Sequence, residues 1–209
     1  MNSKEVSAKR AAVEASGGCS HRKFSKESID KLNEISSLHD NIKEEIKRLL
    51  EGQGLRCNEE FPLDADYNGP KLKGRIDIAC EGPADLIVEV KSSKIGDGRL
   101  ADIYQALIYG DMWKKAHGKR PQIVLVYRRG LEGVKGAEKE VELDLGPLND
   151  RERLKVRLPS KYIYIKLNVD LNVEDLAKEL GTQGYVLSRD CEFCVNEECP
   201  LRRARPTQL

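Results

Sequence analysis

Two short runs in the middle of the chain alternate apolar and charged side chains, which is the pattern of half-buried β-strands. Residues 74–78 contain Asp77, and residues 86–91 contain Glu89 and Lys91, with turn-forming residues between the runs. Glu89 and Lys91 are two positions apart and therefore project from the same face of a strand. Two carboxylates beside an ammonium group can hold a hard divalent cation and leave a positive charge near a bound water. The pattern predicts the kind of metal site that hydrolyses phosphodiesters.

Length and charge restrict the class of protein. The 209 residues contain 36 Lys and Arg against 35 Asp and Glu, so a surface that binds nucleic acid must be a local patch. A chain of this length can bury a substantial core, and we expect one domain over residues 1–209. No apolar run is long enough to span a bilayer, and residues 1–16 lack the apolar stretch of a secretory signal. We therefore expect a cytoplasmic protein with no membrane partner; the sequence indicates no oligomeric state.

The spacing of apolar residues and the turn signals predict an α/β fold. A long amphipathic helix is expected from Ser25, a plausible N-cap, to about Glu51, and Asn172 can cap a short helix near the C-terminus. In full, helices are expected over residues 4–16, 25–51, 99–117 and 172–180, and strands over residues 55–63, 72–80, 85–91, 122–127 and 162–167. Residues 130–157 are charged and glycine-rich, which indicates a hairpin or a long excursion. This order indicates a mixed central β-sheet flanked by helices.

His39 is the candidate for a third metal ligand. It lies on the predicted helix over residues 25–51, at the edge of the apolar stripe. A lone histidine on a helix is more often a packing residue than a ligand. A helix packed across the sheet would nevertheless direct His39 toward Asp77 and Glu89, and we interpret it as a ligand on that ground.

Gln105 and Tyr109 are candidates for contacts with substrate. They are four residues apart on the predicted helix that follows Lys91, so they share one face of that helix. An amide and a phenol at this spacing can reach a phosphate or a base, although ordinary helix packing is the default interpretation of such a pair taken alone. The position of the pair directly after the carboxylate–lysine strand favours the functional interpretation.

Two of the six cysteines stand alone. Cys57 and Cys80 each lie within a strand-like run, and their simplest interpretation is as small buried side chains. Structural disulfides are uncommon in the cytoplasm, the expected compartment, outside hyperthermophiles.

The other cysteines predict a metal site or a metal cluster. Cys191, Cys194 and Cys199 have the spacing C-x₂-C-x₄-C, which can ligate one side of a metal and leaves one ligand to be found. Cys19 follows a Gly-Gly break that frees its backbone, and it is the best candidate for that ligand. Iron–sulfur, zinc and a redox-active disulfide all remain open on this pattern.

Taken in order, three motifs resemble those of RecB-type nucleases of the PD-(D/E)xK superfamily. They are Gly-Arg-Ile-Asp at residues 74–77, Glu-Val-Lys at residues 89–91 and Gln-Ala-Leu-Ile-Tyr at residues 105–109. The upstream helix histidine, His39, also matches. One N-terminal cysteine followed by three C-terminal ones resembles the iron–sulfur members, and the length resembles the CRISPR-associated single-domain exonucleases. The resemblance implies a RecB-like nuclease core with a Cys-ligated metal-cluster appendage.

This resemblance also implies roles for individual residues. Asp77, Glu89 and Lys91 would be catalytic, and Mg²⁺ or Mn²⁺ would be held by His39, Asp77, Glu89 and the backbone carbonyl of Val90. A cluster, [4Fe–4S] in preference to [2Fe–2S], would be formed by the N-terminal Cys19 segment and the C-terminal segment 185–200. Its ligands would be Cys19, Cys191, Cys194 and Cys199.

The implied activity is metal-dependent hydrolysis of single-stranded DNA, with 5′→3′ polarity, in CRISPR spacer acquisition. The implied partners are single-stranded DNA and the CRISPR integrase proteins. Three alternatives remain open: a repair or restriction-type nuclease of the same superfamily, a non-catalytic DNA-binding accessory of the integrase, and a structural zinc protein.

Overall fold

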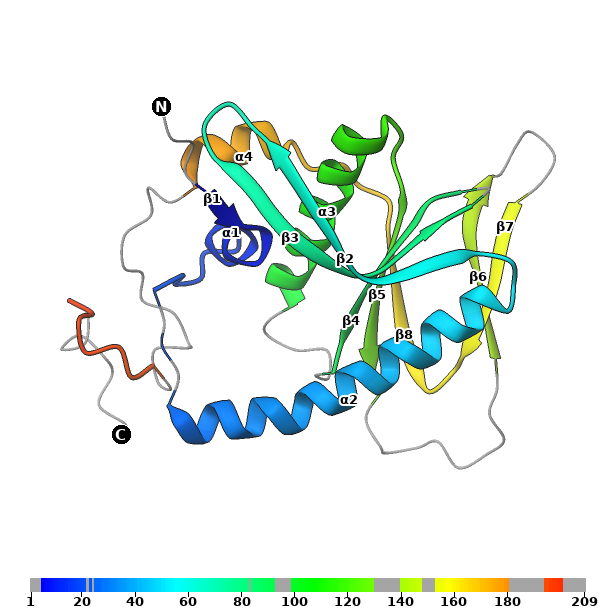
Figure 1. The fold of residues 1–209 in the computed structure, drawn as a ribbon, viewed down its shortest axis with the longest axis horizontal. Helices are drawn as coiled ribbons and strands as arrows, with labels where there is room; N and C mark the ends of the chain where they lie inside the picture. Colours follow the sequence, from blue (N-terminus) through cyan, green and yellow to red (C-terminus); the bar gives the residue numbers. More distant parts are fainter. Residues whose placement is uncertain are drawn as a thin grey trace.

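The computed structural model describes residues 5–21, 23, 25–82, 84–92, 99–129, 140–147, 153–180 and 194–200, with the backbone alone for residues 26–35 (Figure 1). The helices are α1 (Ala8–Ala15), α2 (Lys26–Glu51), α3 (Arg99–His117) and α4 (Val173–Glu179). The strands are β1 (Glu5–Ser7), β2 (Arg56–Asp66), β3 (Lys71–Glu81), β4 (Leu86–Lys91), β5 (Gln122–Arg128), β6 (Glu140–Pro147), β7 (Arg153–Pro159) and β8 (Tyr162–Leu167).

A six-stranded mixed sheet forms the centre of the described structure. Its order is β1-β3-β4-β5-β8, and β2 pairs with β3 outside this order. The β1–β3 and β4–β5 pairs are parallel, whereas β2–β3, β3–β4 and β5–β8 are antiparallel. Parallel strands need a long crossover, and α3 supplies it between β4 and β5. The β6–β7 hairpin forms a separate two-stranded sheet, as the composition of residues 130–157 indicated.

Helices cover both faces of the central sheet (Figure 1). On one face, Ile42, Ile46 and Leu50 of α2 pack against β3, β4 and β5 and against the β6–β7 hairpin. On the other face, α1, α3 and α4 pack together over the sheet. The expected mixed sheet flanked by helices is therefore confirmed. Of the helices in the described ranges, none is at once long and apolar enough to cross a bilayer.

The structure corrects the expected helix over residues 4–16 at its start. Residues 5–7 form β1, because Val6 is 3% exposed and pairs in parallel with Leu72 of β3. Ser7 then caps α1, and its hydroxyl accepts a hydrogen bond from the Arg10 amide at 3.1 Å. A three-residue strand is too short to produce a recognisable alternation in the sequence.

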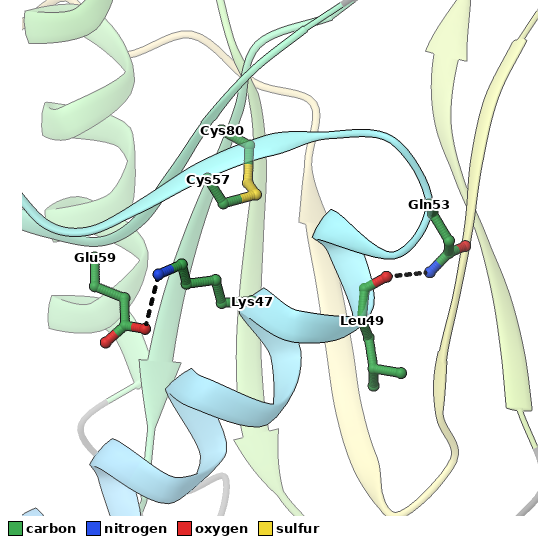
Figure 2. Close-up of a disulfide and its surroundings, with 6 residues drawn as sticks. All are labelled: Lys47, Leu49, Gln53, Cys57, Glu59 and Cys80. Carbon is green, nitrogen blue, oxygen red and sulfur yellow. Dashed lines mark hydrogen bonds and ion pairs between the residues drawn. A yellow bond between two sulfur atoms is a disulfide. The ribbon is translucent and has the colours of Figure 1, made fainter.

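Cys57 and Cys80 are not the separate thiols that the sequence indicated. Both are buried within strands as expected, but their sulfurs are bonded and their Cα atoms are 4.0 Å apart (Figure 2). The turn at Asn68 and Gly69 joins β2 to β3 and sets the register in which Cys57 lies directly opposite Cys80. The disulfide therefore locks the hairpin that carries Asp77.

We expect this disulfide to contribute about 3 kcal/mol to the free energy of unfolding, because it closes a loop with a sequence separation of 23 residues in the unfolded chain. Denaturant unfolding of the oxidised and the thiol-reduced protein measures the difference. The control is the double variant Cys57→Ala/Cys80→Ala, whose stability should not respond to the reductant. Equal stability of the oxidised and reduced wild-type protein would contradict the expectation.

Candidate active site

The candidate site lies where β3 separates from β4. The pairing of these strands ends at Ile78, which lies opposite Val88. Beyond this point, hydrogen bonds between side chains and backbone amides replace the backbone hydrogen bonds between β3 and β4. Asp77 Oδ2 accepts a hydrogen bond from the Val90 amide at 2.8 Å, and Glu89 Oε1 accepts one from the Asp77 amide at 3.4 Å. The opening of the sheet thus places the two carboxylates predicted from the sequence next to each other.

Helix α2 brings His39 to the same point. His39 Nε2 lies 3.3 Å from Asp77 Oδ2 and 3.1 Å from the carbonyl oxygen of Val90. The other ring nitrogen, Nδ1, lies 3.5 Å from Asp40 Oδ1, so both nitrogens have partners. The histidine side chain is 23% exposed. The structure therefore brings together His39, Asp77, Glu89 and Val90, which the sequence resemblance implied as one ligand set.

The donor atoms fit a divalent cation. Adjacent ligands of an octahedral ion with bonds of about 2.1 Å lie about 3 Å apart, and the two distances from His39 Nε2 match this spacing. An imidazole with carboxylate and carbonyl oxygens suits Mn²⁺ and, with more water, Mg²⁺. In the described part of the chain no three His, Cys, Asp or Glu side chains already converge as a metal-binding group. Both oxygens of Glu89 are engaged by other groups, since Oε1 accepts from the Asp77 amide and Oε2 lies 3.1 Å from Lys91 Nζ.

The electrostatics of the site favour a bound cation. Glu89 is 1% exposed; burial first, and then the charge of Asp77, raises its pKa to about 8. Burial also acts against the charge on Asp77, but the hydrogen bond from His39 and the positive charge of Lys91 lower the pKa of Asp77. The hydrogen bond to Asp77 raises the pKa of His39. The raised pKa means that the Glu89 carboxyl keeps its proton to higher pH than a free glutamate, and a divalent ion would displace that proton.

Lys91 donates hydrogen bonds to two acceptors and forms a longer ion pair with Asp102. Its Nζ lies 3.1 Å from Glu89 Oε2, 3.1 Å from Gln105 Oε1 and 3.8 Å from Asp102 Oδ1. Asp102 in turn accepts a hydrogen bond from the Tyr127 hydroxyl at 2.9 Å. Sequence reasoning missed Asp102 and Tyr127, because an acid in the first turn of a helix is ordinary capping chemistry. Burial opposes the charge on Lys91, but the surrounding carboxylates raise its pKa, so the ammonium group stays protonated.

Gln105 and Tyr109 lie behind Lys91. Gln105 Nε2 donates to the Tyr109 hydroxyl at 3.4 Å, while its carbonyl oxygen holds Lys91. Tyr109 is 3% exposed, and burial raises its pKa to about 12. Gln105 is the more exposed of the two, whereas Tyr109 contacts Gln105 from the core.

Gly74 of the first motif is required by the close approach of Tyr109. A Cβ atom at position 74 would lie 2.3 Å from Tyr109 Cε1 and 2.8 Å from its hydroxyl oxygen. The ring, and with it the contact to Gln105, must therefore move in any larger variant.

We expect Gly74→Ala to lower the free energy of unfolding by about 1–3 kcal/mol, the usual cost of overpacking, and to slow any cleavage by displacing the support of Lys91. Thermal unfolding and turnover measure the two effects. Gly82→Ala is the matched control, because a Cβ there meets its nearest neighbour, Leu55, at an ordinary 3.4 Å. A Gly74→Ala protein with the stability and rate of the control would contradict the role of the contact.

The segments over residues 21–23 and 194–196, close in sequence to expected cysteine ligands, contact each other, but the described cysteines Cys19, Cys194 and Cys199 do not converge as a metal-binding group. The Lys23 amide donates to Cys194 Sγ at 3.4 Å, and the Val195 amide donates to the Lys23 carbonyl at 2.9 Å. Asn196 also donates to the His21 carbonyl at 2.7 Å. Two of the expected ligands, Cys19 and Cys194, are buried, and Cys199 is half-buried. Cys191 lies outside the described residues.

Comparisons with known proteins address the fold alone. No protein-family model matches the chain, and no curated protein matches it. A solved structure described as the crystal structure of SSO0001 aligns with 100% of this chain and 89% of that chain, with 16% sequence identity and a TM-score of 0.51. The chain is therefore similar to SSO0001 in its mixed α/β architecture.

Proposed function

We propose that this chain is a Mg²⁺- or Mn²⁺-dependent deoxyribonuclease that degrades single-stranded DNA, with 5′→3′ polarity, during CRISPR spacer acquisition. The observation that carries the proposal is the meeting of His39, Asp77, Glu89 and Lys91 at the opening between β3 and β4. Burying two neighbouring carboxylates is costly, which favours a site built for a cation over a purely structural cluster. The choice of DNA and of the CRISPR role rests on the motif resemblance.

The reaction is the hydrolysis of a phosphodiester. A water oxygen attacks phosphorus, one P–O ester bond breaks, and the leaving oxygen takes up a proton. His39, Asp77, Glu89 and the Val90 carbonyl would hold the cation. When bound, Mg²⁺ or Mn²⁺ would polarise the phosphate and lower the pKa of a bound water.

Lys91 would stabilise the negative charge that develops on the phosphate. Its raised pKa supports this role over that of a general base, because a protonated ammonium group cannot accept a proton from water. Glu89 and Gln105 orient the ammonium group from two sides, so its position is set before substrate arrives.

The cysteines would bind an iron–sulfur cluster, [4Fe–4S] in preference to [2Fe–2S], through Cys19, Cys191, Cys194 and Cys199. The hydrogen bonds between the segments around Lys23 and Val195 support this, as does the amide that donates to Cys194 Sγ. Protein purified without oxygen should be brown and contain iron. Zinc without iron would contradict the cluster and leave the nuclease proposal standing.

The direct test is digestion of end-labelled single- and double-stranded DNA with Mg²⁺ or Mn²⁺. We expect metal-dependent loss of the single strand from its 5′ end, and no cleavage in chelator. Preference for duplex DNA would indicate a repair or restriction-type nuclease. Binding without cleavage would indicate a non-catalytic accessory.

A further inference from the structure

Near the candidate site, the alternating side chains of strands β2 and β3 switch from the α2 side of the sheet to the α3 side. Cys57 belongs to the core under α2, whereas Phe61 packs against Trp113 of α3 with ring centroids 5.4 Å apart. Ile78 likewise belongs to the α2 side, but Ile76 belongs to the α3 side. Residues two or four apart on a regular strand share a face, so each strand must turn over between these positions.

Glu60 stands at the turning point of β2. Glu59 pairs with Ile78 and Phe61 pairs with Ile76, which leaves Glu60 directly opposite Asp77. Its φ of 50° makes it the one non-glycine residue in the described ranges with a positive φ. Left-handed backbone is unfavourable for a glutamate and persists where the surrounding structure enforces it.

The side chain of Glu60 ties this turning point to α2. Its carboxylate lies 2.6 Å from Lys43 Nζ and 3.7 Å from Arg75 Nε. Lys43 is 5% exposed, and its Nζ also lies 3.3 Å from Asp40 Oδ1. Glu60, which lies opposite Asp77 on the sheet, is thus bound to Lys43. Lys43 is one helical turn from His39 on the same face of α2, and His39 is the residue that contacts Asp77.

We propose that Glu60 is a positioning residue for the metal site. Its left-handed backbone marks the point where the hairpin turns over, and the positioning role is assigned to its carboxylate. Its carboxylate, through Lys43, sets α2 at the height where His39 Nε2 meets Asp77 and the Val90 carbonyl. This inference rests on the proposed metal-dependent function and adds to it a residue outside the ligand set.

A neighbouring ion pair provides a matched control. Lys47 Nζ lies 3.5 Å from Glu59 Oε1 and joins the same helix to the same strand, beside the disulfide (Figure 2). It lies two turns from His39 instead of one, and Glu59 has ordinary strand backbone. Glu59 Oε2 also lies 3.9 Å from Lys43 Nζ, so the control removes Lys47 and leaves both Lys43 and Glu59 in place. A general weakening of the contact between α2 and β2 would affect both pairs alike, whereas the proposed positioning acts through the Glu60–Lys43 pair.

The experiment measures Mn²⁺ binding by calorimetry in the wild-type protein, Glu60→Gln, Glu60→Gly and Lys47→Met, with thermal unfolding in parallel. We expect both Glu60 variants to bind Mn²⁺ roughly ten- to a hundredfold more weakly, as is typical when support of metal ligands is lost. Lys47→Met should bind within about twofold of wild type. Because the defect is in binding, raising Mn²⁺ to saturation should restore cleavage by the Glu60 variants. Glycine adopts a positive φ freely, so Glu60→Gly removes the carboxylate without straining the turn.

Failure of the positioning role and failure of the proposed function give different results in this experiment. If wild type binds Mn²⁺ and cleaves DNA while both Glu60 variants bind Mn²⁺ as tightly as wild type, the positioning role is wrong and the proposed function stands. If Lys47→Met weakens Mn²⁺ binding as much as the Glu60 variants, the effect belongs to the helix–strand contact and the positioning role is again wrong. If wild type binds no Mn²⁺, both proposals fall.

Discussion

Glu89→Gln is expected to reduce metal-dependent DNA cleavage on the order of a thousandfold while the protein remains folded. The substitution keeps the size of the side chain and removes one of the two negative charges that would hold the cation. Glu89 is 1% exposed and burial with the charge of Asp77 raises its pKa to about 8, so at neutral pH the neutral glutamine replaces a side chain that is already largely protonated. Stability without metal should therefore change little, and the stabilisation by added Mn²⁺ should disappear.

The pH dependence of stability provides a second test of the Glu89→Gln variant. Without metal, native Glu89 binds a proton between its unfolded pKa of 4.5 and its folded pKa of about 8, whereas the unfolded chain does not. The free energy of unfolding should therefore fall as pH rises through this window. The raised pKa of His39 acts in the same direction above pH 6.5. Glu89→Gln should flatten the slope, while Glu142→Gln, an exposed acid paired with Lys155 on the β6–β7 hairpin, should leave slope and cleavage unchanged.

Lys91→Met is expected to lower kcat roughly a hundredfold or more without weakening Mn²⁺ binding, because the ammonium group acts on the phosphate and not on the cation. Loss of Lys91 also frees Glu89 Oε2, now 3.1 Å from Nζ, for the cation. Lys91→Arg should retain part of the activity, because it keeps the charge. Single-turnover cleavage at saturating metal measures the rate, and calorimetry measures the affinity. An arginine variant as slow as the methionine variant would indicate that Lys91 accepts a proton, contrary to the role given to it here.

Much of the fold follows from local patterns in the sequence. The apolar stripe and the cap at Ser25 predicted α2 within a residue of its observed start, and Asn172 accepts a hydrogen bond from the Asp175 amide as the cap of α4. These signals involve residues within one or two turns of each other, so no tertiary contact is needed to interpret them. The three residues of β1 were missed because only their pairing with β3 makes them a strand.

The Cys57–Cys80 disulfide was missed for a different reason. The strand pattern around each cysteine does not identify its partner, whereas the turn at Asn68 and Gly69 determines which residues of β2 and β3 face each other. Residues equally far from that turn are partners, and Cys57 and Cys80 satisfy this relation. The same relation places Glu60 opposite Asp77. The register was available in the sequence; the φ of Glu60 was not, because nothing in a glutamate predicts left-handed backbone.

The charged residues of the candidate site were predictable from the sequence. The residues that hold them in position were harder to predict. Strand alternation indicated Asp77, Glu89 and Lys91. The place of His39 on the predicted helix indicated that residue, and the motif resemblance agreed. Asp102 and Lys43 act through contacts between elements far apart in sequence, such as the 3.8 Å approach of Asp102 to Lys91. Such contacts depend on how α2 and α3 pack on the sheet, which no local pattern encodes.

Cleavage of 5′- and 3′-end-labelled single-stranded DNA by wild type and Glu89→Gln, with Mn²⁺ and with chelator, tests the central claim most directly. We expect Mn²⁺-dependent shortening from the 5′ end by wild type, none in chelator, and none above background for the variant. Cleavage by Glu89→Gln at the wild-type rate, or cleavage by wild type that persists in chelator, would contradict a metal-dependent site at the opening between β3 and β4.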